Sequence, residues 1–162
     1  MNMNYLSPLE FQVTIKRMPN IEFYVQKASI PSISTNPVEK QTPLNRLYET
    51  GDRLEYGQFD LSFTVDEKLS SYLEVLNWMV GYSSPQHTDQ YKVLRDSEYG
   101  LKSDISLLIV NSNKNPNINV SFYDCFPTSL SEIQLDTTVT GLTYPEATAS
   151  FTYDYFKIDI VT

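Results

Sequence analysis

Three prolines punctuate the run Ala28-Ser-Ile-Pro31-Ser-Ile-Ser-Thr-Asn-Pro37-Val-Glu-Lys-Gln-Thr-Pro43-Leu-Asn-Arg46, which continues to Gly51-Asp52-Arg53. Strand-like segments precede and follow it, and residues 28–53 show no helical periodicity. A connection of about twenty-five residues is too long for an ordinary turn, and such loops are usually functional or disordered. Because this one keeps Ile, Val, Leu and Tyr, we expect it to pack against a neighbouring copy of the chain.

The segments around this loop alternate apolar and polar residues, which is the pattern of strands with one buried face. The alternation covers residues 9–17, 21–27, 59–65, 118–122 and 147–155. Residues 105–110 are apolar at both parities, as in a central strand, and residues 111–117 resemble a long hairpin turn. Six or seven such strands predict a mainly β fold, an antiparallel β-sandwich or barrel.

One helix is predicted over residues 65–81, flanking the β structure. Thr64 and Glu67 have the spacing of a capping box, and Gly81 offers a C-terminal stop. Four apolar residues then form one stripe, which we expect to be the packing face: Leu69, Leu73, Leu76 and Val80. Trp78 is expected to be a large core or boundary residue.

The chain of 162 residues is expected to be one domain, residues 1–162, large enough to bury a core. Within it we distinguish the long assembly loop 28–53, the helix 65–81 and a variable insertion 82–103. No signal-peptide pattern occurs at the N-terminus, and no window approaches the roughly 18 apolar residues of a membrane span. We therefore expect a soluble chain, made in the cytosol, that does not insert into a membrane.

The net charge of the chain is −8, from 20 acidic and 12 basic side chains. A dedicated nucleic-acid binder needs a clustered basic surface, and only Arg46 and Arg53 bring two arginines close together. The excess of acid favours solubility, and it would also repel DNA.

The residues of the usual catalytic and metal sites are scarce. His87 is the only histidine and lies in a polar loop, while Cys125, the only cysteine, lies on an apolar strand where packing is its default role. The carboxylates lack the spacing of a calcium loop, and no nucleotide-binding motif occurs among five glycines. We expect the chain to have no enzymatic activity, no metal site and no cofactor.

Aromatic residues leave two interpretations open. Twelve tyrosines and eight phenylalanines are many for this length, and aromatic residues are enriched at protein interfaces. Besides an aromatic core, the tyrosines could form a ligand-binding face, as in a lectin-like β-sandwich, or a subunit interface. The long loop of apolar and charged residues favours the interface.

Four features occur in order along the chain. Residues 23–53 form a strand, a long loop and a return that closes with Gly51-Asp52-Arg53. Next, Phe59-Asp-Leu-Ser-Phe-Thr-Val-Asp-Glu67 leads into the helix with Trp78, and Phe126-Pro-Thr-Ser-Leu-Ser-Glu132-Ile-Gln-Leu-Asp136 precedes an aromatic strand that reaches Phe156. In order and spacing, these features resemble the tail tube proteins of contractile-tailed (myovirus-type) bacteriophages, a family related to the tubes of contractile injection systems.

This resemblance implies a structural virion protein that is assembled in the host bacterial cytoplasm. Members of the family form stacked hexameric rings in which sheets of neighbouring subunits join into a continuous β-barrel around a channel. Through this channel DNA passes during ejection without tight binding. The implied partners are further copies of the chain, the tail sheath, and baseplate or hub proteins. A baseplate tube-initiator ring of the same fold is an alternative, because relatives often carry Trp where this chain has Phe126.

The resemblance also suggests two sets of site residues. The loop would contact a neighbouring subunit or ring through Leu44, Arg46, Leu47, Tyr48, Asp52 and Arg53. The lumen candidates are the polar residues of two strands, either Asp60, Ser62 and Thr64, or Thr148, Ser150, Thr152 and Asp154.

Overall fold

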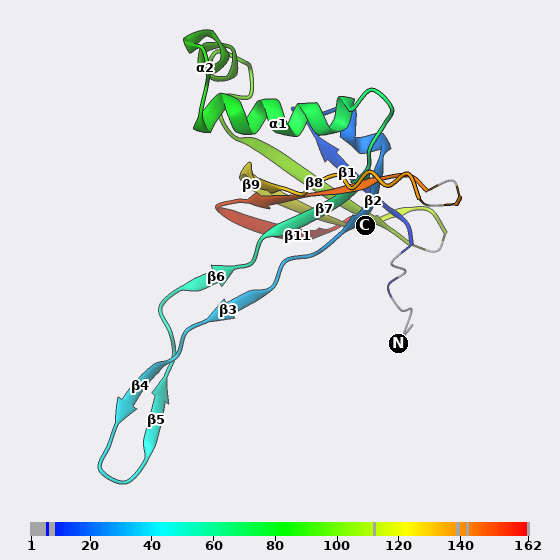
Figure 1. Ribbon diagram of the computed structural model, residues 1–162. Coiled ribbons are helices and arrows are strands. Elements are labelled where there is room, and N and C mark those ends of the chain that lie inside the picture. Colours follow the sequence, from blue (N-terminus) through cyan, green and yellow to red (C-terminus); the bar gives the residue numbers. More distant parts are fainter. Residues whose placement is uncertain (1–5, 7–8, 112, 139, 142, 162) are drawn as a thin grey trace.

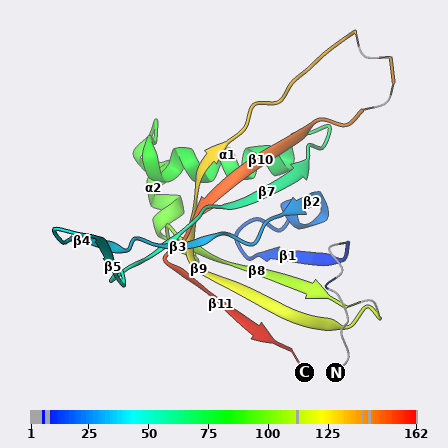
Figure 2. The same cartoon turned by 90° about the horizontal axis from the view of Figure 1, so that it is seen from below.

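The computed structural model describes residues 6, 9–111, 113–138, 140–141 and 143–161. Within them, antiparallel strands form two layers that share one long strand, β9 (Figures 1 and 2). The first layer contains β1 (Phe11–Ile15), β8 (Ser103–Val110), β9 (Pro116–Leu130) and β11 (Tyr155–Ile160). The second contains β9, β10 (Glu146–Thr152), β7 (Phe59–Thr64) and β2 (Val25–Ala28). The prediction of a mainly β, antiparallel fold is confirmed.

Aromatic residues fill the space between the two layers. Phe59 of β7 lies with its ring centroid 4.6 Å from that of Phe122 on β9 and 6.3 Å from that of Phe151 on β10. All three side chains are fully buried, and they belong to the apolar parity of their strands. The period-two pattern therefore places one face of each layer in a common core.

The predicted helix is real, but its boundaries and its packing face differ. Helix α1 (Ser70–Ser83) begins after Leu69, whose φ of 57° is in the left-handed region. The Asp66 carboxylate accepts hydrogen bonds from the Ser71 N–H and hydroxyl. The packing face contains Ser71, Val75, Trp78 and Gly81. The prediction that the leucine stripe is the packing face is wrong, because Leu69, Leu73 and Leu76 are exposed.

A second helix lies in the segment treated as a variable insertion. Short helix α2 (Thr88–Arg95) packs against α1 at one end of the molecule (Figure 1). Its sequence has Asp89 in the first turn and Lys92 and Arg95 in the last, an arrangement that favours a helix. The expectation of a single flanking helix was therefore incomplete. No helix in the described ranges has the length and apolar character needed to span a membrane.

The loop predicted over residues 28–53 is largely ordered as β structure. Strand β3 (Ile33–Thr35) pairs with β6 (Leu54–Tyr56), and β4 (Val38–Gln41) pairs with β5 (Arg46–Glu49), so that two short ladders follow one another along a hairpin. Pro31, Pro37 and Pro43 lie between these strands and not within them, because proline cannot donate to a ladder. The prolines therefore divide the hairpin without preventing it.

Two further boundaries differ from the predictions. Residues 21–23 form a 3-10 turn before β2 instead of the start of a strand. The segment 147–155, predicted as one strand, divides after Thr152, and β11 then crosses to the first layer, where Phe156 pairs with Phe122. In the described part of the chain, the path of paired strands ends at β1 and β2 and does not close on itself.

Replacement of Phe151 by Ala is expected to lower the free energy of unfolding by about 3–5 kcal/mol, because it opens a cavity between the layers. Urea unfolding monitored by circular dichroism measures the loss. The matched control is Ile160→Ala, at a side chain that is 74% exposed, and it should change stability by less than about 0.5 kcal/mol. Equal losses in the two variants would contradict the proposed position of the core.

Candidate assembly site

The hairpin of residues 33–56, called the arm below, projects far from the two layers (Figure 1). All residues of its four strands are exposed, including several large apolar side chains. Leu44 at the tip is 92% exposed. A two-stranded hairpin without a core is at best marginally stable by itself in water. The arm therefore has no core of its own and presents apolar side chains to solvent.

The root of the arm is fixed to the body by aromatic residues. Tyr153 donates a hydrogen bond of 2.8 Å from its hydroxyl to the Gly57 carbonyl, and burial raises the pKa of Tyr153 to about 12. The ring of Tyr56 lies 5.9 Å from that of Tyr153 and 5.7 Å from that of Phe156. These contacts set the direction in which the arm leaves the body.

Two features along the arm hold its strands together. At the change from one ladder to the next, the Asn36 side-chain amide donates a hydrogen bond of 2.6 Å to Glu55. A Cβ at Gly51 would lie 2.2 Å from the Asn36 carbonyl oxygen, so the two strands approach too closely there for any side chain. Glycine is thus a steric requirement at this position.

All six predicted contact residues lie on the arm and are exposed: Leu44, Arg46, Leu47, Tyr48, Asp52 and Arg53. The register of the outer ladder separates them into two faces, because Arg46 and Tyr48 share one face and Leu47 lies on the other with the Lys40–Glu49 ion pair (3.2 Å). Within the described residues, neither Arg46 nor Arg53 forms an ion pair. Their role as contacts stays a prediction.

The lumen candidates mostly share one face of the second layer. Asp60 accepts a hydrogen bond of 2.6 Å from Ser150, and the hydroxyls of Ser62 and Thr148 lie 2.9 Å apart. Thr64 pairs with Glu146 at the end of the same ladder. These residues form a polar surface opposite the core, with Thr152 at the same parity of β10, and it is called the polar face below.

Asp154 does not belong to this face. It follows the end of β10, and its carboxylate pairs with Lys102 at 3.3 Å. The first layer has a polar outer surface of its own, on which Ser106 and Asn119 are hydrogen-bonded at 3.3 Å. The alternation of polar and apolar residues therefore identifies two polar surfaces. It does not show which of them lines a channel.

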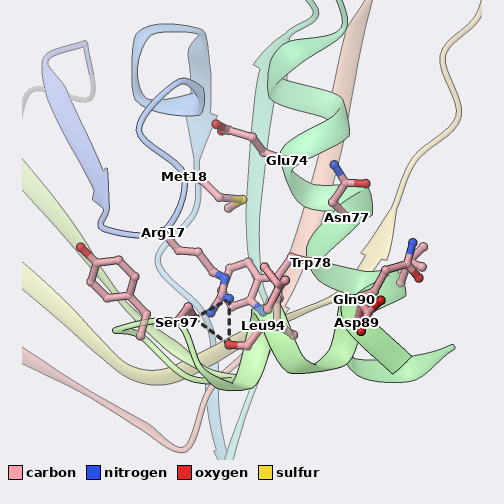
Figure 3. Close-up of a pocket in the computed structure, with 12 residues that line it drawn as sticks. Arg17, Met18, Glu74, Asn77, Trp78, Asp89, Gln90, Leu94 and Ser97 are labelled. Atoms are coloured by element: carbon pink, nitrogen blue, oxygen red, sulfur yellow. Dashed lines mark hydrogen bonds between the residues drawn. The ribbon is translucent and has the colours of Figure 1, made fainter. Parts of the chain in front are cut away.

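A groove between α1 and α2 was not predicted from the sequence. It encloses about 600 Å³, and Figure 3 shows the side chains that converge on it from both helices and from the segment after β1. Trp78 lies at its floor, donating from Nε1 to the Leu101 carbonyl (2.9 Å) beneath the Arg17 guanidinium, 5.1 Å from the ring centroid. Val93 at the rim is 73% exposed. The adjacent apolar residues Val93 and Leu94 in an otherwise polar segment could have indicated this groove from the sequence.

Two carboxylates line this groove, Glu74 from α1 and Asp89 from α2. Glu74 accepts a hydrogen bond of 2.6 Å from Asn20, while its second oxygen is buried and has no hydrogen-bond donor among the residues that the structure describes. Desolvation is the main reason why the pKa of Glu74 is raised. Arg17 donates instead to Ser97 (3.1 Å) and to the Gly100 carbonyl. The groove therefore combines an apolar floor with an acidic lining.

The single thiol is part of the core. Cys125 is buried between the layers, and burial raises its pKa to about 12. A thiol with this pKa is protonated at neutral pH and is a poor nucleophile. Packing, as predicted, accounts for Cys125.

Comparisons with known proteins find phage tail tube proteins both among family models and among single relatives. The family described as phage tail tube protein matches residues 3–159 of this chain. The tail tube terminator protein of Enterobacteria phage T4 is 28% identical over 138 residues, which cover 83% of this chain and 76% of the T4 protein.

Two solved structures show the same fold. A chain in the sheath-tube complex of the extracellular contractile injection system PVC, in the extended state, superposes with a TM-score of 0.64 at 15% identity, over 99% of this chain and 95% of that one. A chain in the tube-terminating cap of the anti-feeding prophage gives a TM-score of 0.64 at 17% identity, over 99% and 95% of the two chains.

Replacement of Gly51 by Ala is expected to loosen the arm, because the new Cβ would collide with the Asn36 carbonyl oxygen. A local destabilisation of about 1–3 kcal/mol should make trypsin cleave faster after Arg46 and Arg53. Gly141→Ala is the control, since its Cβ would meet no described residue within 4 Å. Unchanged cleavage in Gly51→Ala would show that the arm tolerates a side chain there.

Proposed function

Because this chain belongs to the phage tail tube protein family, we propose that it forms a closed ring on the tube of a contractile tail and that this ring is the tube terminator. As a member of this family the chain is a structural component of the virion tail and not an enzyme. The observation that carries the finer role is the 28% identity to the T4 tail tube terminator protein over 83% of this chain.

The open strand edges support assembly into a ring. Strands β1 and β2 end the path of paired strands, and β11 lies at a further edge beside β9. Exposed edges promote pairing with other chains, and closure of a sheet around a barrel removes them. Strand pairing between neighbouring copies would satisfy these edges. Six copies per ring is the number that we propose, in line with the six-fold symmetrised baseplate of the anti-feeding prophage, one chain of which has the same fold (TM-score 0.63).

The repeated subunit of the tube is the second candidate. It is supported by the likeness to a chain of the PVC sheath-tube complex, and a baseplate initiator ring is a variant of the same assignment. A terminator ring must offer one stacking surface to the tube and must not propagate further, whereas a repeated subunit stacks on both sides. The tail sheath and the baseplate or hub proteins are the partners proposed for the assembled ring.

The polar face of the second layer is proposed to line the channel. Its side chains are hydroxyls and carboxylates, which do not attract phosphate. Lys27 at its edge is paired with Glu146 at 3.2 Å. Phosphate binding depends on lysine and arginine that displace counterions. DNA would therefore slide along this surface without being held.

Negative-stain electron microscopy of the purified chain over a range of concentrations tests the assembly. Isolated rings that do not stack are expected, and long tubes would favour the repeated subunit over the terminator. A variant with Arg46, Tyr48 and Arg53 replaced by Ala is expected to lose assembly while its circular dichroism is unchanged. A monomer at every concentration would contradict ring formation by the chain alone.

Lysines introduced on the polar face test the channel wall. The double variant Asp60→Lys, Ser150→Lys is expected to delay DNA ejection and reduce plating of a phage that carries it, because each added cation that reaches a phosphate strengthens binding. Asp159→Lys with Ser121→Lys makes the same charge change on the outer surface of the first layer and should have little effect. The reverse result would assign the channel wall to the first layer.

A further inference from the structure

The groove between α1 and α2 lies on a different part of the molecule from the arm (Figure 1). Its floor is apolar, with Met18, Trp78 and Leu94, and Asp89 stands at its α2 side without an ion pair or hydrogen bond among the described residues (Figure 3). An open apolar groove bordered by a free carboxylate has the composition of a protein-binding site, in which charge selects the partner.

The arm carries the complementary groups. Leu44 lies at the tip, and Arg46 and Tyr48 point to one face of the outer ladder. Lys40 on the opposite face is neutralised by Glu49, so Arg46 is the cation of the tip that is available to a partner. Arginine and tyrosine are also the residue types that most often dominate the binding energy of an interface.

We propose that the tip of the arm of one copy docks in the groove between α1 and α2 of the next copy. Leu44 and Tyr48 pack on the apolar floor, and Arg46 pairs with Asp89. The inference rests on the proposed ring and names the surface that receives the arm. Because the arm and the groove are different surfaces of one chain, the contact is head-to-tail, and its repetition generates a closed ring when the rotation closes.

The charges around the groove agree with this partner. Its lining contains two carboxylates, Glu74 and Asp89, and one guanidinium, that of Arg17. Arg17 is occupied by Ser97, the Gly100 carbonyl and the face of Trp78. Glu74 is partly buried and accepts a hydrogen bond from Asn20, so Asp89 is the exposed carboxylate of the two. The arm brings donors to this surface.

Disulfide trapping between separate chains tests the contact. A Leu44→Cys variant is mixed with a differently tagged Val93→Cys variant, so that a mixed dimer is recognised by its mass. Buried Cys125 does not compete, because burial keeps its pKa at about 12. The control mixture pairs Leu44→Cys with Leu135→Cys, which places an exposed thiol in the segment before β10, away from the groove and from the open strand edges. The mixed dimer is expected to form much faster in the first mixture than in the control.

Charge exchange gives a second, independent measurement. Arg46→Glu and Asp89→Lys are each expected to raise the concentration needed for assembly by about fivefold per contact, the upper range for an exposed ion pair. The double variant should return toward the wild-type value, since the pair is restored with reversed sign. Circular dichroism of each variant shows whether it is folded. Additive losses in the double variant would overturn the proposed pair.

The two proposals fail in different ways. Rings in the micrographs together with trapping no faster than the control would overturn the docking of the arm in the groove and leave the ring intact. Monomers in the micrographs together with no trapping would contradict both. Rapid trapping accompanied by rings supports both.

Discussion

Both layers depend on the strand β9, because it is a member of each. Its first part pairs with β8 and β11, and its last part pairs with β10. The change occurs near Asp124, which has a φ of 56°, a value that non-glycine residues rarely adopt, and the Asp124 N–H is satisfied by the Asp104 carboxylate at 3.2 Å. Phe122 and Cys125, on either side of this bend, are both fully buried. A straight β9 could not serve two layers, and Phe59 and Phe151 would lose the partner that joins them.

The strands could be predicted because their physical signal is local. Alternation in residues 59–65 and 118–122 records one buried face, whatever the partner strand is. The helix face could not be read in the same way, since Leu73, at 42% exposed, has a more apolar side chain than Ser71, which is fully buried. Ser71 is buried because its N–H and hydroxyl reach Asp66, a contact that depends on the turn at Leu69 and not on hydropathy.

The arm shows the opposite relation between pattern and structure. Its place in the chain, residues 28–53, followed from prolines and apolar side chains in a long connection. Its hairpin pairing did not, because ladders such as Val38 with Glu49 need no periodic hydrophobicity when neither face is buried. The groove could not be predicted from the sequence for a different reason. Met18 and Leu94 are far apart in the chain, and only the packing of α2 on α1 brings them together.

The exposure of the arm has a consequence for the timing of assembly. An isolated hairpin gains little from its own contacts, so the entropy of ordering it must be offset by the surface that receives it. The first copies to meet lose this entropy before a ring is complete, whereas a copy that joins an already formed partner finds its docking surface ready. Assembly of this kind has a slow start and rapid continuation, as helix formation does on a smaller scale. The proposed ring would then form slowly from free chains and quickly beside a tube end that already presents the docking surface.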